Sequence, residues 1–408
     1  MSESTLHTGE LESYEQPATV VGMRPADKWL LFAVLSLMFM SLVIVYSASA
    51  FWAEIRFQNP AYFLKSHMFK VLAGVVLIFI LAKFDYHKYQ KLALLLIEIS
   101  VALLVVAIGE HVVIKGAARW IHAGPFSFEP SDLAKVAILI FVAAHLSENS
   151  EKLGDRKSLY RPLAWTLIVV VLIGKQPNYS TAMIIAAIVG VLLFLGGARK
   201  SHLAILALIA IAAGAAFLML ESYRVARMKS WLDHGSGDYQ VRQSIIGFGN
   251  GGILGVGPGN SKQRNLFLPE PYGDFIYSII GEEYGLWGSV FVMLLFLFIA
   301  FRGTAIAKRA PDRFGFLLAG GITTMISLYA FINAGVALGI FPTTGLPMPL
   351  VSYGGTAMIV NAACIGILLN ISKQIPETFG EHAVKVEKQK VRKKKNRGSD
   401  PVVGRIYS

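Results

Sequence analysis

The sequence is short of cysteine and of charged residues, and both shortages narrow the class of protein. Only one of its 408 residues is cysteine, Cys364, which excludes an intramolecular disulfide and a cysteine metal cluster. Charged residues make up 16% of the chain and hydrophobic residues 54%, a balance too apolar for a soluble domain of this length. The composition therefore indicates a protein whose solvent is a membrane.

We also expect no cleavable signal peptide of the usual kind. Residues 1–27 are polar, and the apolar run that follows has no typical small-residue cleavage site. We expect this run to be retained as the first membrane anchor, behind a cytoplasmic polar tail at 1–27.

Long apolar runs fill most of the remaining sequence. They approach the roughly 20 residues that a spanning helix needs, and they lack the alternation of a closed β-barrel. A polar patch at 175–178 divides two of the runs, and if it is only a kink the number of spans is nine. The sequence otherwise predicts an all-α polytopic membrane protein with about ten transmembrane helices, at 29–48, 68–82, 92–109, 132–148, 163–175, 181–197, 202–220, 275–300, 315–334 and 355–372.

Lysine and arginine in the short connections predict the orientation, because such residues favour the cytoplasmic side. The basic tail at 374–408 falls on that side too, so both termini are expected in the cytoplasm. The tail is either a solvated extension or a surface for anionic lipid or a cytoplasmic partner. The cations that define the cytoplasmic side are Lys83, Lys88, Lys91, Lys152, Arg156, Lys157, Arg161, Arg199, Lys200, Arg302, Lys308, Arg309 and Arg313.

The opposite side carries a large extracytoplasmic loop at 221–274, which is longer than a connection requires. Basic residues lie there against the topological preference, which favours an anionic ligand, although a translocated loop can also carry charge. Glycines crowd 247–259, but no strand precedes them and no Gly-Lys-Ser/Thr closes them, so a nucleotide-binding loop is excluded. We expect them to permit positive φ and close approach of substrate. The loop cations are Arg224, Arg227, Lys229, Arg242, Lys262 and Arg264.

Three further outward segments carry candidate chemistry. Asp274 precedes an apolar run, where it is either a helix N-cap or a functional carboxylate. Lys135, one turn inside the fourth span, is either a lysine reaching for the interface or a cation for phosphate. The irregular segment 341–356, rich in proline and glycine, must line a cavity or be buried in protein at that depth.

These segments, in this order, resemble the SEDS family (shape, elongation, division and sporulation proteins) of the FtsW and RodA type. The resemblance covers roughly residues 27–373, so we identify 28–373 as a SEDS transmembrane domain between two cytoplasmic tails. The segments that carry it are 46–49, 116–135, 176–177 with 180–182, 239–244, 251–257, 268–270 with 274–276, 281–283 and 342–355.

The resemblance implies a peptidoglycan glycosyltransferase that polymerises lipid II into β-1,4 glycan at the outer face of the cytoplasmic membrane. The donor would be glycan on undecaprenyl pyrophosphate. In the family the aspartate that matches Asp274 is the proposed catalytic residue, here a base for the acceptor hydroxyl. Cations must meet the leaving pyrophosphate. The candidate substrate-binding residues are Lys135, Arg119, Arg242, Gln240, Glu283 and Ser352.

Some residues depart from the family pattern. Tyr272-Gly273 stands where the family usually has His-Thr, Gln176-Pro177-Asn178 replaces Glu-Pro-Asp, and Asp132 replaces a glutamate. The second change removes two carboxylates and weakens any metal or acid role there. Mg²⁺ or Mn²⁺ bridging Asp274 or Glu283 to phosphate is a further expectation, and no organic cofactor is expected.

The partners that the resemblance implies are a class B penicillin-binding protein and other divisome proteins, with membrane lipids around the chain and no nucleic acid. A role at the division septum is favoured over elongation by the polar N-terminal extension, the basic tail and residues 257–264. Two other functions stay open, a lipid II flippase and a non-catalytic scaffold for a transpeptidase. Against a transporter, no convincing internal repeat is seen and the polar residues crowd one face.

Overall fold

The computed structural model describes residues 25–109, 119–123, 126–152, 157–219, 222–232 and 238–376. Most of both predicted tails, Arg156 and the side chains of Lys152 and Arg224 lie outside the described residues.

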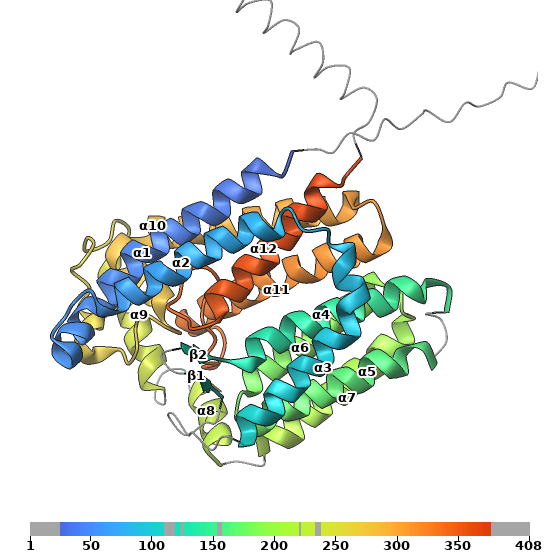
Figure 1. Ribbon diagram of the computed structural model, residues 1–408. Coiled ribbons are helices and arrows are strands. Elements are labelled where there is room, and N and C mark those ends of the chain that lie inside the picture. Colours follow the sequence, from blue (N-terminus) through green and yellow to red (C-terminus); the bar gives the residue numbers. More distant parts are fainter. Residues whose placement is uncertain are drawn as a thin grey trace, which may run out of the picture. The chain divides into compact units, whose positions relative to one another are not determined.

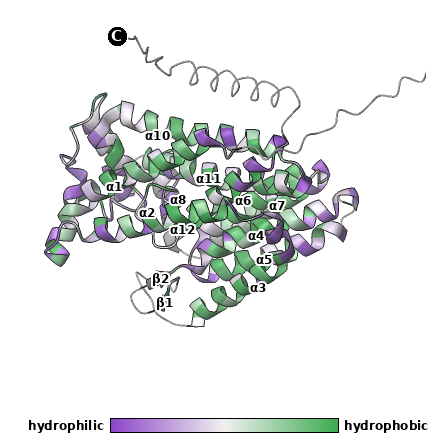
Figure 2. Cartoon of the chain, turned by 45° about the horizontal axis from the view of Figure 1, so that its top comes forward, coloured by the Kyte–Doolittle hydropathy of each residue, from purple (hydrophilic) through white to green (hydrophobic). Residues whose placement is uncertain are grey.

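Each of the ten predicted spans is a helix (Figure 1). Seven are long and apolar enough to cross a membrane, and α6, the first part of α7 and α12 are shorter apolar helices. Figure 2 shows hydrophobic residues along the helices and hydrophilic residues gathered at their ends and connections. The helices are α1 (Lys28–Phe57), α2 (Tyr62–Leu81), α3 (His87–Gly109), α4 (Pro130–Glu148), α5 (Lys157–Lys175), α6 (Tyr179–Leu195), α7 (Lys200–Met219), α10 (Ile276–Arg309), α11 (Arg313–Ala337) and α12 (Ala357–Lys373).

The all-α prediction needs one correction. Two short strands, β1 (Ile121–Ala123) and β2 (Phe126–Phe128), pair antiparallel with Ile121 opposite Phe128. Ile121, Phe126 and Phe128 are of the β-branched and aromatic kinds that favour strands, and the pairing satisfies backbone groups of both strands.

The polar patch at 175–178 turns the chain instead of kinking one helix. It separates α5 from α6, and these two helices pack against each other. The start of α5 lies beside α4, where His145 Nε2 is 2.9 Å from Ser158 O. The end of α6 lies at α11, where Arg313 donates to Gly196 O at 2.6 Å. The alternative of a single kinked helix is therefore wrong.

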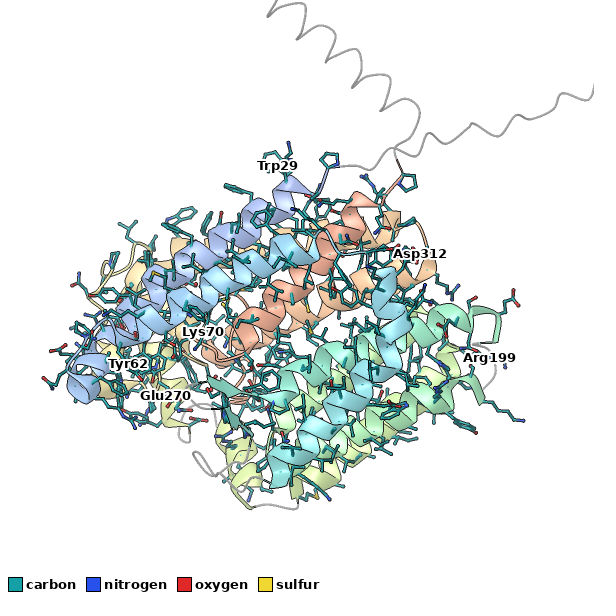
Figure 3. All side chains as sticks on the ribbon, viewed as in Figure 1. Trp29, Tyr62, Lys70, Arg199, Glu270 and Asp312 are labelled. Carbon is teal, nitrogen blue, oxygen red and sulfur yellow. The ribbon has the colours of Figure 1, made fainter. Side chains whose placement is uncertain are left out.

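Several helix ends that are predicted to be cytoplasmic lie together at one end of the bundle, connected by hydrogen bonds and one ion pair. Asp27 caps α1 and forms an ion pair with Arg302 of α10, 2.5 Å apart, and its backbone N–H donates to Ser372 of α12. The Tyr86 hydroxyl, just before α3, donates to Asp312, just before α11. In Figure 3, Trp29, Asp312 and Arg199 mark this end, and Tyr62 and Glu270 lie toward the other. The first and last membrane helices therefore begin and end on the same side.

Helix α4 lies inside the bundle, in contact with α3, α5, α6, α11 and α12. Of the most apolar stretch of α4, 83% is buried, a larger share than in the other described helices that are long enough to cross a membrane. A polar side chain on α4 therefore needs a partner within the protein.

The long outward loop folds into α8 (Ser222–Leu232), α9 (Tyr239–Gly251) and a π-helical turn, η2 (Gln263–Phe267). The glycines between α9 and η2 include four with positive φ, at 252, 255, 257 and 259, as the sequence predicts. The backbone that approaches them closely is that of α10.

Helix α10 breaks at Gly285, whose φ of 65° and ψ of −158° are not helical. A break within a span frees backbone groups that lipid cannot satisfy. The glycine segment pairs with them instead. The bonds are Val256 N to Glu282 O at 2.9 Å, Gly257 N to Glu283 O at 3.0 Å and Leu286 N to Gly252 O at 2.9 Å.

Replacing Gly251 by alanine is expected to destabilise the protein, because a β-carbon there would lie 2.0 Å from the carbonyl oxygen of Gly281. Backbone cannot move aside as a side chain can, so we expect a loss of roughly 2 to 3 kcal/mol. Thermal unfolding in detergent measures it. The matched control is Gly249→Ala on the same helix, where nothing lies within 4 Å of the added carbon. Equal melting temperatures for the two variants would contradict the close packing.

Candidate active site

Asp274 lies in the turn that leads into α10, at the end of the bundle opposite the helix ends predicted to be cytoplasmic. The helix begins at Ile276 with Phe275 at the N-cap position, so the expectation that Asp274 caps this helix is wrong. The chain makes one more turn before the helix starts, which leaves the carboxylate outside it. Gly345 passes beside this carboxylate, since a β-carbon there would lie 3.5 Å from Asp274 Oδ2.

Three consecutive carbonyls around Asp274 accept hydrogen bonds from other segments. Tyr272 O accepts from the N–H of Tyr353 at 2.9 Å, and Gly273 O accepts from the Ser352 hydroxyl at 2.7 Å. Asp274 O accepts from the Asn333 amide at 2.7 Å. The turn that carries the carboxylate is thus held by α11 and by the irregular segment before α12.

The middle of the irregular segment is buried in protein, as its depth requires. Residues 346 and 348–352 are buried, and Asn333 also donates to Leu346 O at 2.7 Å. Ser352, a predicted substrate-binding residue, is 3% exposed and also accepts from Met348 N at 2.8 Å. These bonds give Ser352 a structural part in holding the Asp274 turn.

Lys135 is buried at 4% exposure and forms an ion pair with Asp132, with 2.7 Å between Nζ and Oδ1. Its Nζ also lies 4.8 Å from the centre of the Tyr329 ring. Lys135 therefore does not extend to the interface, and that alternative is wrong. The other oxygen of Asp132 accepts from Thr356 at 2.7 Å, which joins α4 to the start of α12.

Glu129 precedes α4 and completes a group that we call the outer polar network: Glu129, Ser131, Asp132, Lys135 and Asn178. Its Oε1 accepts from Ser131 at 2.6 Å and from Asn178 at 2.9 Å. Burial, followed by the charge of Asp132, raises the pKa of Glu129 from its ordinary 4.5 to about 7. The family usually has a carboxylate at position 178, where this chain has Asn178. Here Glu129 brings a carboxylate into contact with that position instead.

Arg119 is held by the turn between α5 and α6. It donates to Gln176 O at 3.0 Å and also to Pro177 O. The guanidinium is half-buried, so this cation lies at the edge of the outer polar network with part of its surface open.

Gln240 and Arg242 lie in the first turn of α9. Asp238 caps that helix and also accepts from Thr343 at 2.7 Å, two residues before Gly345, which connects α9 to the surroundings of Asp274. Arg242 is exposed, and among the described residues it has no ion-pair partner.

Glu283 lies at the break in α10 instead of beside Asp274. It accepts from Ser47 of α1 at 2.5 Å, and Arg264 donates to Ser47 O at 2.8 Å. The helical residues between Asp274 and Glu283 rise roughly 12 Å, so the two carboxylates cannot share one ion. Within the described ranges, no group of three or more His, Cys, Asp or Glu could hold a metal.

The sequence interpretation missed Asn333, Thr356 and Tyr329 as members of the site. The signal for Asn333 was present, because an amide inside an apolar span needs a partner. Nothing in the sequence indicated that this partner is the Asp274 backbone.

Glu129 predicts a pH dependence of stability. An acid whose pKa is higher in the folded chain holds its proton better there, so its stabilising contribution is present at low pH and is lost as the pH rises from 4.5 to about 7. We expect Glu129→Gln, which keeps an acceptor for Ser131 and Asn178, to remove this decline and to raise the melting temperature at pH 8. Melting curves from pH 5 to 8 measure it, with exposed Glu54→Gln as control. A parallel decline in wild type and Glu129→Gln would refute the assignment.

Comparison with known proteins identifies the family. A family model described as cell cycle protein, covering FtsW, RodA and SpoVE, matches residues 28–376. The chain is 35% identical to stage V sporulation protein E of Bacillus subtilis, over 85% of this chain and 97% of that protein. It is 34% identical to a probable peptidoglycan glycosyltransferase FtsW of Geobacter metallireducens, over 86% of this chain and 96% of that protein.

Solved structures give the same result. A chain from a structure titled as a peptidoglycan synthase complex that coordinates polymerization and crosslinking aligns with a TM-score of 0.73 at 26% identity, over 86% of this chain and 99% of that one. The rod shape determining protein RodA of Thermus thermophilus aligns with a TM-score of 0.65 at 26% identity, over 86% and 98%. This chain is therefore a multi-pass membrane protein that belongs to the FtsW, RodA and SpoVE family of cell cycle proteins.

Proposed function

We propose that this protein is a peptidoglycan glycosyltransferase that polymerises lipid II at the outer face of the cytoplasmic membrane. The observation that carries the proposal is the placement of Asp274 in a firmly held turn at the outer end of the bundle. Relatives named as peptidoglycan glycosyltransferases support the activity.

The chemistry assigned to Asp274 is that of a general base. Its carboxylate takes the proton from the 4-hydroxyl of the acceptor sugar while that oxygen attacks the anomeric carbon of the donor. The bond from this carbon to the phosphate oxygen breaks, and undecaprenyl pyrophosphate leaves with the electron pair. Attack from the opposite face inverts the carbon and gives the β-1,4 link.

The leaving pyrophosphate requires cations, and the three candidates differ in how free they are. Lys135 is buried and neutralised by Asp132, so we assign it to holding the outer polar network. Arg119 keeps part of its guanidinium open. Arg242 is exposed and bears the full charge, so we assign it to the phosphates, with Gln240 beside it.

A divalent cation fits this site in one way. Mg²⁺ or Mn²⁺ is commonly held by one or two carboxylates together with substrate phosphates, and Asp274 is the carboxylate that could serve. Such an ion would supply neutralisation of phosphate charge. Glu283 is too far along α10 to join it.

We place both termini in the cytoplasm and the protein at the division septum. The cations of the connections support the orientation, and the FtsW names of several relatives support the septum. A class B penicillin-binding protein is the proposed partner, because the aligned solved structure is a complex for polymerization and crosslinking.

Asp274→Asn and Asp274→Ala are expected to lower glycan polymerisation by roughly 10² to 10⁴-fold, the usual contribution of a general base. The assay gives purified lipid II to the purified protein, alone and with its cognate transpeptidase, and separates products by length. Thermal unfolding of both variants is the control for their folding. Undiminished polymer from both variants would overturn the assignment of Asp274, and no polymer from wild type with its partner would favour a flippase or a scaffold.

Arg242→Gln is expected to lower kcat/KM for glycan polymerisation about 10-fold, since it removes one charge-assisted contact to the leaving pyrophosphate of the donor. The matched control is Lys262→Gln, which removes an exposed cation elsewhere in the same loop. Equal kcat/KM values for the two variants would remove Arg242 from the substrate site.

A further inference from the structure

Two short structures connect Asp274 to the outer polar network. The first is the segment 352–356. At one end Ser352 donates to Gly273 O at 2.7 Å and the N–H of Tyr353 donates to Tyr272 O at 2.9 Å. At the other end the Thr356 hydroxyl donates to Asp132 at 2.7 Å and accepts from the N–H of Glu129 at 3.2 Å.

The second connection is one turn of α11. Asn333 donates to Asp274 O at 2.7 Å, and Tyr329, four residues earlier, places its ring 4.8 Å from Lys135 Nζ. One turn of helix fixes their separation along the axis at about 6 Å. The segment 352–356 reaches at most about 14 Å even when fully extended. The two connections run between the same two groups.

The segment also has little room to shift. Ser352 is 3% exposed, and its hydroxyl makes two bonds, donating to Gly273 O and accepting from Met348 N at 2.8 Å. Gly355 lies against Trp120, since a β-carbon at Gly355 would lie 2.7 Å from the indole. Packing of this kind gives the segment the stiffness that a spacer needs.

The proposed reaction demands such a fixed distance. The base must lie within hydrogen-bond reach of the acceptor hydroxyl, and that oxygen must lie 3 to 3.5 Å from the anomeric carbon, so base and carbon are roughly 6 Å apart. The leaving phosphate lies just beyond the carbon. Arg119, the partly open cation at the edge of the outer polar network, is the candidate on that side for the phosphate, in addition to Arg242.

We propose that the segment 352–356 and the turn from Tyr329 to Asn333 are parallel spacers that hold Asp274 at a set distance from the outer polar network. Ser352, Thr356 and Asn333 are then positioning residues for the polymerase reaction. This inference rests on the proposed function.

The test compares Ser352→Ala, Thr356→Val and the double variant in the complex with its transpeptidase, with kcat and KM for lipid II as readouts. A misplacement of about 1 Å costs up to 10²-fold in rate, so we expect each single variant to lose at least about 10-fold in kcat with KM within about 2-fold. The double variant should lose no more than the worse single variant, because releasing either end frees the same segment.

Conservative variants and a control separate positioning from general damage. Thr356→Ser and Ser352→Thr keep the hydroxyls and should retain most of the wild-type kcat. Thr324→Val removes a hydroxyl that bonds only its own helix, at Gly320 O and 2.8 Å, and should leave kcat unchanged. Unaltered kcat in Thr356→Val, or losses that multiply in the double variant, would overturn the proposal.

Hydrogen exchange tests the coupling without turnover. In Thr356→Val we expect the amides of 270–278 to exchange at least about 10-fold faster than in wild type, although this peptide lies far away in sequence. Unchanged exchange there would overturn the spacer. If wild type makes no polymer, the proposed function fails, while the exchange result still decides whether the segment couples the two groups.

Discussion

Every backbone group inside a bilayer must find its partner within the protein. Each departure from regular helix therefore needs a second segment that satisfies its backbone. In the part of the chain that the structure describes, two such departures are the break at Gly285 and the irregular segment before α12. At the break, the glycine segment after α9 supplies the missing donors and acceptors, with bonds near 3 Å to residues on both sides. Before α12, Asn333 and Ser352 supply them. The non-helical backbone is thus stabilised by close contact between segments distant in sequence.

The same bonds place the functional groups. Because Asn333 and Ser352 satisfy the irregular segment by also holding the turn of Asp274, the carboxylate is fixed by groups that the membrane already requires. At the start of α4 the burial of Lys135 demands a counter-ion, and Asp132 provides it while accepting from Thr356. A buried pair of this kind is weak evidence for stability and better evidence for a fixed arrangement. Rigidity around Asp274 suits a reaction whose rate depends on geometry.

The charged residues divide by depth into two kinds. Inside the bundle, Lys135 forms an ion pair with Asp132, and one oxygen of Glu283 accepts from Ser47. Arg242, the charged residue of α9, is open to solvent. Only a cation of the second kind can offer its full charge to a pyrophosphate that arrives from the membrane, whereas the first kind holds the frame. For this reason we assign the proposed contact with the leaving pyrophosphate to Arg242, in the long loop at 221–274.

By itself the sequence determined the ten helices, from the length of the apolar runs, and the helix ends that lie together, from the placement of lysine and arginine. Local motifs determined the family. All three signals are read along the chain. It also singled out Asp274, Lys135 and the glycines with positive φ. The tertiary structure decided what each of these residues contacts: Lys135 is paired, Asp274 lies outside the helix it was expected to cap, and Glu283 lies far from it. It also placed β1 with β2 and brought Thr356 and Asn333 into the site. These outcomes depend on contacts between residues up to 236 positions apart, and no local pattern encodes a partner at that distance.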